Sequence, residues 1–321
     1  MILPLLKELN KLEYIKQNFK KNRLAYILIL PAIIAMLMIH FIPMVEGLYI
    51  SLLNLNQYTL LKFLHAPFVG LKNFYTILFD PASTLRIGFM DAVRNTIIYT
   101  IVTNLSVLII GLWLAHVLKQ EFKGRGIART LLLLPWVVPS YVVGMIWGFM
   151  WRQDSGIINK IIVDYLHLLS HKPFWLIGPN VLIAIIIPTI WRSFPMTMIM
   201  LLAALQTISD DYYEAAEIDG ATGWQKLIYV TLPFLKPVIG TLILFGMIGS
   251  IYSYNIVAMM FGNGAGYPGD WGDLVMTNIS RNSFNMWQFG TGAAASVMLM
   301  IGVLALTGVW YKVFKDSLTM Q

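Results

Sequence analysis

Long apolar stretches, separated by shorter polar and charged segments, dominate the chain. Six of them hold about 20 or more mostly apolar residues, enough for a helix to cross roughly 30 Å of hydrocarbon. None alternates with a period of two, which argues against transmembrane β-strands. We therefore predict an all-α membrane protein with six transmembrane helices. The expected spans are about 24–44, 96–118, 131–151, 181–205, 238–261 and 289–311.

Composition agrees with lipid as the solvent. Of the 321 residues 58% are hydrophobic and 12% charged, whereas a soluble domain carries about 25% charged residues. The chain has no cysteine, and its five histidines are scattered, so we predict no metal site. The net charge of +7 would suit nucleic acid, but most of the basic residues lie beside the apolar spans. Membrane lipid is the expected surrounding, and no nucleic-acid partner is expected.

The distribution of lysine and arginine predicts the orientation of the spans. Residues 1–23 carry six basic residues and the short loop 119–129 carries four. Both lie on the cytoplasmic side, as the positive-inside rule requires, if the N-terminus is cytoplasmic. Six crossings then return the C-terminus to the cytoplasm, and the segment 206–237 is cytoplasmic as well.

The chain divides into two parts. Residues 1–23 form a basic cytoplasmic segment in which apolar residues recur at helical spacing over 2–21. This pattern favours an amphipathic helix on the inner membrane surface, with a disordered basic tail as the alternative. Residues 24–321 form one transmembrane domain.

An acidic cluster interrupts the apolar pattern in the segment 206–237, where residues 212–223 read YYEAAEIDGATG. Ser209 and the aspartates after it predict the start of a helix, because a serine cap and early acids suit a helix N-terminus. Gly220 permits a sharp change of direction at its end. The sequence therefore predicts a short polar helix at the membrane surface.

A second short helix is expected after the bend. Thr222 is its predicted cap, and we expect Pro233 and Pro237 to end it before the next span. The small side chains of Ala215 and Ala216 leave the first helix narrow enough for close docking against another protein.

The same segment resembles the EAA motif of binding-protein-dependent ABC importers. That motif runs Glu-Ala-Ala, three residues, Gly, nine residues, an aliphatic residue, one residue and Leu-Pro. The matching positions are Glu214, Ala215, Ala216, Gly220, Val230, Leu232 and Pro233, with Val in place of the commoner Ile. Stretches that resemble the carbohydrate-importer branch of the family, the MalF type, are FVGLKNF (68–74), AVRNTIIYT (92–100), LLLLPWVVP (131–139) and LAALQTI (202–208).

The resemblance covers nearly the whole chain from about residue 24 and implies a fold and partners. It implies the type I ABC importer permease architecture, in which the motif forms a coupling helix seated in a cleft of a cytoplasmic ATPase subunit. It also implies a second EAA-type permease as heterodimer partner, two ATP-binding subunits, an extracytoplasmic solute-binding protein and the bacterial plasma membrane. The expected ATPase-coupling residues are Asp211, Tyr213, Glu214, Ala215, Ala216, Asp219, Gly220 and Ala221.

The chain contains no GxxxxGK[ST] phosphate loop. We therefore expect a non-catalytic subunit without a cofactor of its own, with ATP and Mg²⁺ bound by the partner subunits.

Arg192 lies near the middle of the fourth span, where an arginine costs about 2.5–3.5 kcal/mol to insert and therefore faces protein or water. It either bonds to carbonyls freed by Pro188 and Pro195 or to a partner permease, or faces the translocation path and neutralises an anionic sugar. Both interpretations stay open. The resemblance places this part of the span beside the sugar pocket, with Thr189, Arg192, Ser193 and Met196 as lining residues.

The fifth span carries a polar group within a predicted helix, which suits either contact with a sugar or hydrogen bonds between helices. Its members are Tyr252, Ser253, Tyr254 and Asn255. Weaker candidates in the third span are Tyr141, Trp147 and Trp151, and for Trp151 a place in the interfacial aromatic belt is favoured. The external loops 152–180 and 262–273 are expected to meet the binding protein.

Together these patterns predict the membrane-spanning subunit of an ATP-driven importer that moves an oligosaccharide by alternating access. The sugar is either acidic, of the uronate type, or neutral, and another solute is the alternative. An ion-coupled secondary transporter would need an intramembrane carboxylate, and an intramembrane enzyme would need paired catalytic residues. The six predicted spans contain neither.

Overall fold

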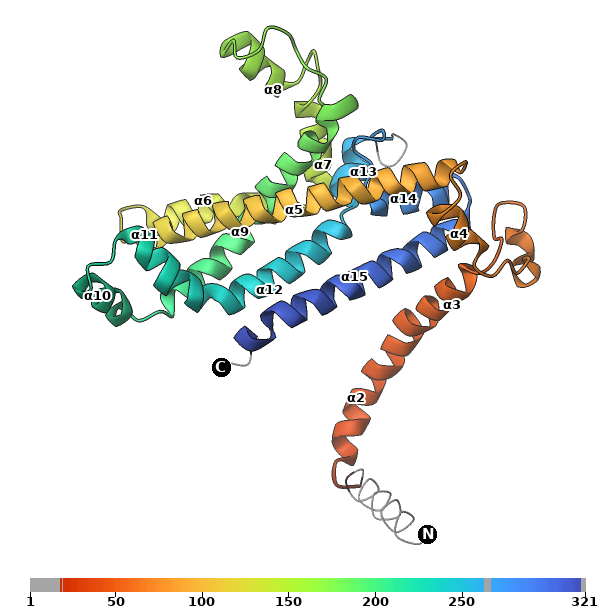
Figure 1. Cartoon of the computed structure of the whole chain (residues 1–321), viewed down its shortest axis with the longest axis horizontal. Coiled ribbons are helices and arrows are strands. Elements are labelled where there is room, and N and C mark those ends of the chain that lie inside the picture. Colours follow the sequence, from red (N-terminus) through yellow and green to blue (C-terminus); the bar gives the residue numbers. More distant parts are fainter. Residues whose placement is uncertain (1–17, 19, 263–266, 319–321) are drawn as a thin grey trace.

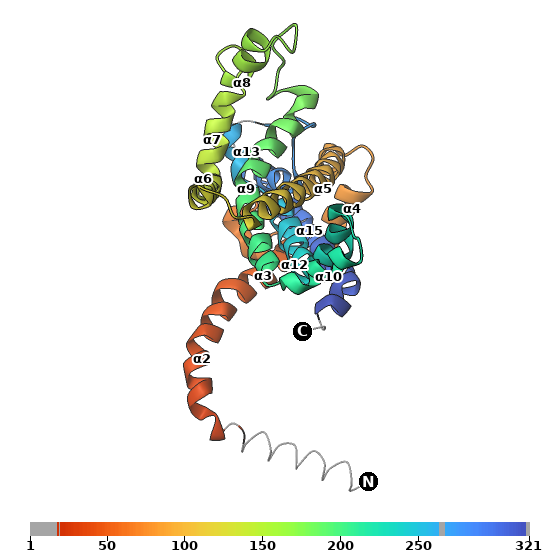
Figure 2. The same ribbon diagram turned by 90° about the vertical axis from the view of Figure 1, so that its left-hand side faces the viewer.

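The computed structural model describes residues 18, 20–262 and 267–318 and is helical almost throughout. The predicted amphipathic helix over 2–21 lies almost wholly outside the described residues. The long helices α5, α9, α12 and α15 gather into one bundle, while α2 projects away from it in both views (Figures 1 and 2).

Five helices are long and apolar enough to cross a membrane within the described part of the chain, and a bent pair would make a sixth crossing. This confirms the all-α prediction with five to six spans. The spanning helices are Arg23–Ile50 (α2, Arg23–Met36; a π-helical turn, Leu37–Phe41; α3, Ile42–Ile50), α5 (Thr84–Lys119), the pair α6 (Arg125–Val137) and α7 (Ser140–Met150), α9 (Val181–Gln206), Gly223–Ile251 and α15 (Phe289–Leu318). Shorter helices are Leu60–His65, α4 (Lys72–Leu78), α8 (Ile157–Asn159), Lys160–Tyr165, Gly178–Asn180, α10 (Asp210–Ile218), α13 (Asn255–Met260), α14 (Val275–Ser280) and Arg281–Asn285.

The third span is broken, and the prediction of one continuous helix over 131–151 is wrong. Helices α6 and α7 meet at 91°. Val138 between them is extended, with φ −67° and ψ 125°, because the ring of Pro139 disfavours a helical conformation in the residue before it.

The fifth span continues through its prolines, so the expectation that Pro233 and Pro237 end the preceding short helix is also wrong. Helix α11 (Gly223–Lys226), a π-helical turn (Leu227–Thr231) and α12 (Leu232–Ile251) form one continuous helix. The wide π turn directly before Pro233 accommodates a residue that cannot donate to the helical ladder.

The same helix ends at Ile251, well short of the predicted end at 261. A break over 252–254 follows, and α13 begins at Asn255. Three of the four polar residues of the fifth span therefore form a helix break, and the fourth, Asn255, begins the next helix.

Buried side chains form three clusters along the bundle. One surrounds Tyr99 between α5, α7, α9 and α13, and a second fills the space between the C-terminal halves of α5 and α9 and helix α12. The third joins α4, α5, α14 and α15 around Ile77 and Phe89. In contrast, the most apolar stretch of the N-terminal span has no residue buried against the rest of the described chain.

A buried ion pair fixes the segment before α14. Asp273 is 1% exposed and lies 2.7 Å from Arg281 Nη2. Its carboxylate also accepts from Thr277 Oγ1 at 2.7 Å and from Asn278 Nδ2 at 2.9 Å. The backbone carbonyl of Asp273 accepts from Asn95 Nδ2 on α5 at 3.1 Å, so this segment is tied to α5.

Candidate functional site

The acidic cluster folds into α10, and the residues after its bend form α11. We call the two short helices together the coupling segment (209–226). Helix α10 begins at Asp210, and its N-cap is Ser209, whose Oγ accepts from the backbone N–H of Asp211 at 3.4 Å. Two aspartates occupy the first turn. Gly220 has φ +75°, the left-handed conformation that favours glycine after a helix. The predicted cap and bend are both confirmed.

Helix α11 is closed by a reciprocal cap. The Thr222 Oγ1 accepts from Gln225 N at 3.3 Å, and the Gln225 side chain accepts from Thr222 N at 2.7 Å. The predicted capping role of Thr222 is confirmed. An ion pair of 2.5 Å between Lys226 and Glu217 then ties α11 to α10.

Contacts around Tyr213 anchor the coupling segment to the bundle. Its hydroxyl lies 3.1 Å from Thr231 Oγ1 in the fifth span. Lys119, at the end of α5, places its Nζ 4.4 Å from the centre of the Tyr213 ring and 3.6 Å from Asp210. Helix α5 and the helix Gly223–Ile251 therefore hold one face of α10.

The opposite face of the coupling segment is open. Ile218 is 87% exposed and Trp224 is 69% exposed, beside exposed carboxylates. Of the eight predicted coupling residues, Asp211, Glu214, Ala215, Asp219 and Gly220 are exposed, and Tyr213, Ala216 and Ala221 are half-buried. Exposed apolar groups flanked by acids form a surface suited to docking against another protein.

All eight predicted substrate-path residues line one membrane cavity of about 570 Å³. Helices α5, α9 and α12 and the start of α13 form its walls. Thr189, Arg192, Ser193 and Met196 come from α9. Tyr252, Ser253 and Tyr254 come from the break after α12, and Asn255 is the first residue of α13. The structure thus brings together two groups that lie far apart in the sequence.

Arg192 is half-buried in the cavity wall and donates from Nε to the backbone carbonyl of Val138 at 3.1 Å. That carbonyl belongs to the break between α6 and α7, so the Nε partner is not one of the carbonyls that Pro188 and Pro195 were expected to free. Of the ion pairs between described residues, none includes Arg192. One of the five N–H donors of the guanidinium is therefore used in a structural hydrogen bond between helices.

Tyr99 joins three walls of the cavity. It is 0% exposed, and its hydroxyl donates to Thr189 Oγ1 on α9 at 3.0 Å and lies 2.9 Å from Ser253 Oγ. Asn255 Nδ2, at the start of α13, donates to Ser140 Oγ of α7 at 3.3 Å. These bonds agree with the interhelical alternative for the polar group and leave the sugar-contact alternative open.

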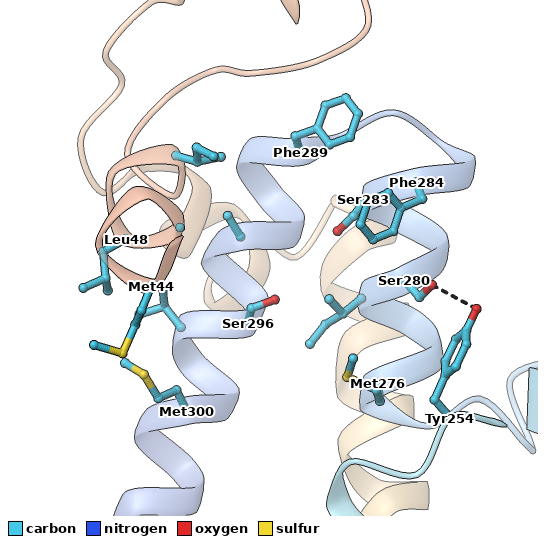
Figure 3. Close-up of a pocket in the computed structure, with 15 residues that line it drawn as sticks. Met44, Leu48, Tyr254, Met276, Ser280, Ser283, Phe284, Phe289, Ser296 and Met300 are labelled. Carbon is cyan, nitrogen blue, oxygen red and sulfur yellow. Dashed lines mark hydrogen bonds between the residues drawn. The ribbon is translucent and has the colours of Figure 1, made fainter. Parts of the chain in front are cut away.

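Tyr254 lines both this cavity and an apolar groove of about 810 Å³ between α3, α14 and α15. Figure 3 shows its hydroxyl turned toward α14, where it accepts from Ser280 Oγ at 3.3 Å. The Tyr254 side chain is therefore part of the wall between the two hollows.

Sequence reasoning missed the polar residues that α5 contributes to the cavity. Thr103 and Asn104 line it together with Ser250 of α12. Asn104 Nδ2 donates to Ser250 Oγ at 3.0 Å. The signal was present, because polar residues recur at 96, 99, 100, 103 and 104, one face of a helix.

The interpretation of Trp151 as an interfacial belt residue is wrong. It is 3% exposed and donates from Nε1 to the carbonyl of Ala184 at 3.1 Å. Its ring centroid lies 4.8 Å from that of Trp175 and 5.6 Å from that of Trp147. Trp151 is a core residue that joins α7 to α9.

Metal-ligating residues do not cluster in the described part of the chain: it holds no group of three or more His, Cys, Asp or Glu that could bind an ion.

Comparison with known proteins identifies the family. Residues 107–319 match the family model for the inner membrane component of binding-protein-dependent transport systems. The chain is 31% identical over 300 residues to the trehalose/maltose transport system permease protein MalF of Thermococcus litoralis (93% of this chain, 96% of that protein). It is 34% identical over 265 residues to the inner membrane ABC transporter permease protein YcjO of Escherichia coli (82% of this chain, 85% of that protein).

A solved structure shares the fold. A chain in the crystal structure of a bacterial ABC transporter involved in the import of the acidic polysaccharide alginate superimposes with a TM-score of 0.75 at 21% identity, covering 96% of this chain and 100% of that one. The family match and the shared fold confirm the resemblance drawn from the EAA motif. This chain belongs to the family of binding-protein-dependent ABC transport permeases, and it is a multi-pass, non-catalytic component of the inner membrane.

Proposed function

We propose that this chain carries an oligosaccharide across the membrane as one of two permease subunits of an ATP-driven importer. Its coupling segment docks on a subunit that binds ATP and Mg²⁺, and an extracytoplasmic binding protein delivers the sugar. One observation carries the proposal. The continuous helix Gly223–Ile251 joins the coupling segment at one end to the cavity residues 252–255 at the other.

This helix is a mechanical link between the motor and the cargo. Its 29 residues span about 44 Å at roughly 1.5 Å per residue. At the cytoplasmic end, Lys226 and Thr231 attach it to α10. A displacement of α10 by the ATPase therefore moves the helix and, with it, the wall of the cavity. Alternating access follows if that movement opens the cavity to one side at a time.

The cavity chemistry favours a sugar. Hydroxyl and amide groups from α5, α9 and α12 can pair with sugar hydroxyls, and an aromatic face such as that of Tyr252 can stack on a sugar ring. A volume of about 570 Å³ is within the range of roughly 300–1,000 Å³ for small-molecule sites. The relative MalF of Thermococcus litoralis is named for trehalose and maltose transport, which supports a saccharide here.

We further propose that the sugar is acidic and that Arg192 binds its carboxylate. The bond to Val138 uses Nε, so the two Nη groups can present the paired donors that match a carboxylate. A neutral oligosaccharide is the second candidate. The trehalose and maltose in the name of the relative are neutral, and Arg192 then serves only the break between α6 and α7.

The coupling role is tested with Glu214→Lys and Ala216→Trp in the assembled complex, reconstituted in vesicles with its binding protein. Glu121→Lys is the matched control, because Glu121 is equally exposed on the cytoplasmic side, outside the coupling segment. We expect uptake and binding-protein-stimulated ATP turnover to fall by about tenfold or more in the first two variants, as placing an unpaired charge or a bulky ring in a docked interface costs several kcal/mol. Wild-type rates in both variants would refute the docking role.

The charge of the cargo is tested with Arg192→Gln and uptake of an acidic and a neutral oligosaccharide of equal length. A charge-assisted bond contributes about 1.5–3 kcal/mol, so uptake of the acidic sugar should fall about tenfold or more beyond that of the neutral one. Equal losses for both sugars would remove the acidic-cargo proposal and leave the neutral one.

A further inference from the structure

A second polar hollow lies at the end of the bundle opposite the coupling segment. It has a volume of about 260 Å³ and lies between residues 53–58, Asn73 at the start of α4, and residues 286–291 at the start of α15. Figure 1 shows α4 and the start of α15 together at one end of the molecule, with α10 and α11 at the other. We call this hollow the outer pocket, because the predicted orientation places it outside the cell.

The outer pocket has a rigid frame. Gly290 donates its backbone N–H to the carbonyl of Leu55 at 2.9 Å, and a side chain at Gly290 would clash with the carbonyl of Leu53. Asn73 is 8% exposed and donates from Nδ2 to the carbonyls of Ser51 and Leu53, at 2.8 and 2.9 Å. Three separate segments are thus locked together by backbone and amide bonds.

The lining of the pocket is amide-rich and uncharged. Its polar side chains are Asn54, Asn56, Gln57, Asn73, Gln288, Thr291 and the Tyr58 hydroxyl, and no Asp, Glu, Lys, Arg or His is among the described residues that line it. Both N–H donors of Asn73 are used by the frame, so of this side chain only the amide oxygen is left to accept a hydrogen bond. The pocket therefore presents hydrogen-bond donors and acceptors without a charge to attract ions.

Two exposed aromatic rings flank these amides. Tyr58 is 85% exposed, and its backbone N–H is held by Asn56 Oδ1 at 2.9 Å. Trp287 is 47% exposed and has φ +57°, a conformation that is rare for a bulky residue. Its ring packs edge-on against Phe289, with centroids 6.0 Å apart. Strained residues of this kind cluster at ligand sites.

We propose that the outer pocket binds an uncharged sugar ring on the external face, separately from the membrane cavity. Vicinal hydroxyls need partners that donate and accept side by side, which amides provide, and the C–H faces of the ring stack on aromatic side chains. The volume equals that of about nine water molecules at roughly 30 Å³ each, enough for one ring with its hydroxyls. The assignment of this sugar as transported cargo rests on the proposed function.

The absence of charge from the described lining gives the outer pocket a selectivity that differs from that of the cavity. A uronate or another anionic sugar finds no cation there, whereas Arg192 lies in the cavity wall. A neutral glycoside is therefore the ligand of the outer pocket even if the cavity prefers an acidic cargo.

The test is sugar binding to the purified full complex in detergent, without the binding protein, measured by saturation-transfer NMR. The probes are maltose and, as the anionic comparison, glucuronate. Tyr58→Ala should weaken maltose binding about fivefold or more through the lost stacking contact. Trp287→Asn should do the same while keeping the fold, since asparagine tolerates a positive φ. Tyr165→Ala is the matched control, a tyrosine 74% exposed outside the pocket.

The outcomes separate this proposal from the proposed function. Maltose binding that survives Gly249→Trp, a substitution that fills open space in the membrane cavity, but is weakened in Tyr58→Ala supports an outer site independent of transport through the cavity. Unchanged maltose binding in both Tyr58→Ala and Trp287→Asn would overturn the outer pocket as a sugar site. If a separate titration with the binding protein showed weaker affinity in these variants while maltose binding was unchanged, the pocket would be a docking surface, and the sugar site would be overturned equally. Neither of these two results would alter the predictions for the coupling segment.

Discussion

Gly220 allows the bend of the coupling segment to be perturbed with little change to its exposed surface, because alanine adds only a methyl group there. The residue ends α10 in a Schellman motif: Gly220 N donates to the carbonyl of Glu217 at 3.0 Å, and Ala221 N donates to that of Ala216 at 2.9 Å. Its φ is +75°, and a side-chain Cβ would meet nothing within 4 Å. Gly220→Ala therefore adds backbone strain alone, with no steric clash.

The energetic cost of Gly220→Ala follows from the left-handed backbone conformation at this position. Forcing an L-residue there costs about 1–2 kcal/mol, which lowers the population of the native bend about 5- to 30-fold. Gly220→Asn should cost less, because asparagine tolerates this conformation. The bend controls how α10 is held against α11, so uptake per ATP hydrolysed should fall in the order Gly, Asn, Ala.

Hydrogen exchange of the reconstituted complex measures the effect directly. We expect the amide protection of Ala221 to fall by the same 5- to 30-fold in Gly220→Ala. Gly223→Ala is the control, because Gly223 is helical and a Cβ there is also free of contacts, so alanine should favour the helix by about 0.5–1 kcal/mol. Equal exchange and equal coupling in the two variants would refute the reasoning.

Two further predictions concern the bundle. Asp273→Ala should destabilise the complex by up to about 3–5 kcal/mol in thermal unfolding, because Arg281 loses its buried partner. Asp273→Ala with Arg281→Met should recover part of that loss, and a double variant no more stable than Asp273→Ala would contradict the buried pair. Gly246→Ala would bring a Cβ against the side-chain oxygen of Asn104, so we expect a loss of about 1–3 kcal/mol from overpacking. Gly308→Ala, with no atom within 4 Å of the added Cβ, should leave the free energy of unfolding within about 0.5 kcal/mol of wild type. An unchanged melting midpoint in Gly246→Ala would disprove the close approach.

The coupling segment could be predicted in detail because its signals are local. Ser209, Gly220 and Thr222 act on backbone groups two or three residues away, and such contacts depend little on the rest of the fold. These local signals determine the backbone of the segment but do not identify the protein that docks on its exposed face. That partner is inferred from the resemblance to the ABC importer family.

The prolines show where local reasoning fails. Pro139 breaks a span at 91°, whereas Pro233 lies within a continuous helix. A proline removes one donor and crowds the preceding turn, but a π turn before it can absorb that crowding. Whether a helix breaks at a proline or widens into a π turn before it depends on the helices packed around it, which the sequence of one span does not reveal.

About half of the polar lining of the membrane cavity could be predicted from the sequence. Arg192 drew attention to α9 because a charge within a span is costly, and the polar group at 252–255 stood out in an apolar stretch. Tyr99, Thr103 and Asn104 are uncharged and stand in a stretch that is mostly apolar. Their common face gains meaning only when α5 is seen to pack against α9 and α12.

The two interpretations of Arg192 are compatible, because one guanidinium can serve both. The break at Pro139 leaves the carbonyl of Val138 in need of a donor, and Arg192 supplies it through Nε. The planar group then points its two Nη atoms away from that bond, as a fork that fits a carboxylate. A lysine ammonium, a single point charge, cannot hold the carbonyl and present a fork together. Arg192→Lys should therefore reduce uptake of an acidic sugar nearly as much as Arg192→Gln, although it keeps the positive charge. Full uptake in Arg192→Lys would show that charge alone is sufficient and that the bond to Val138 is dispensable.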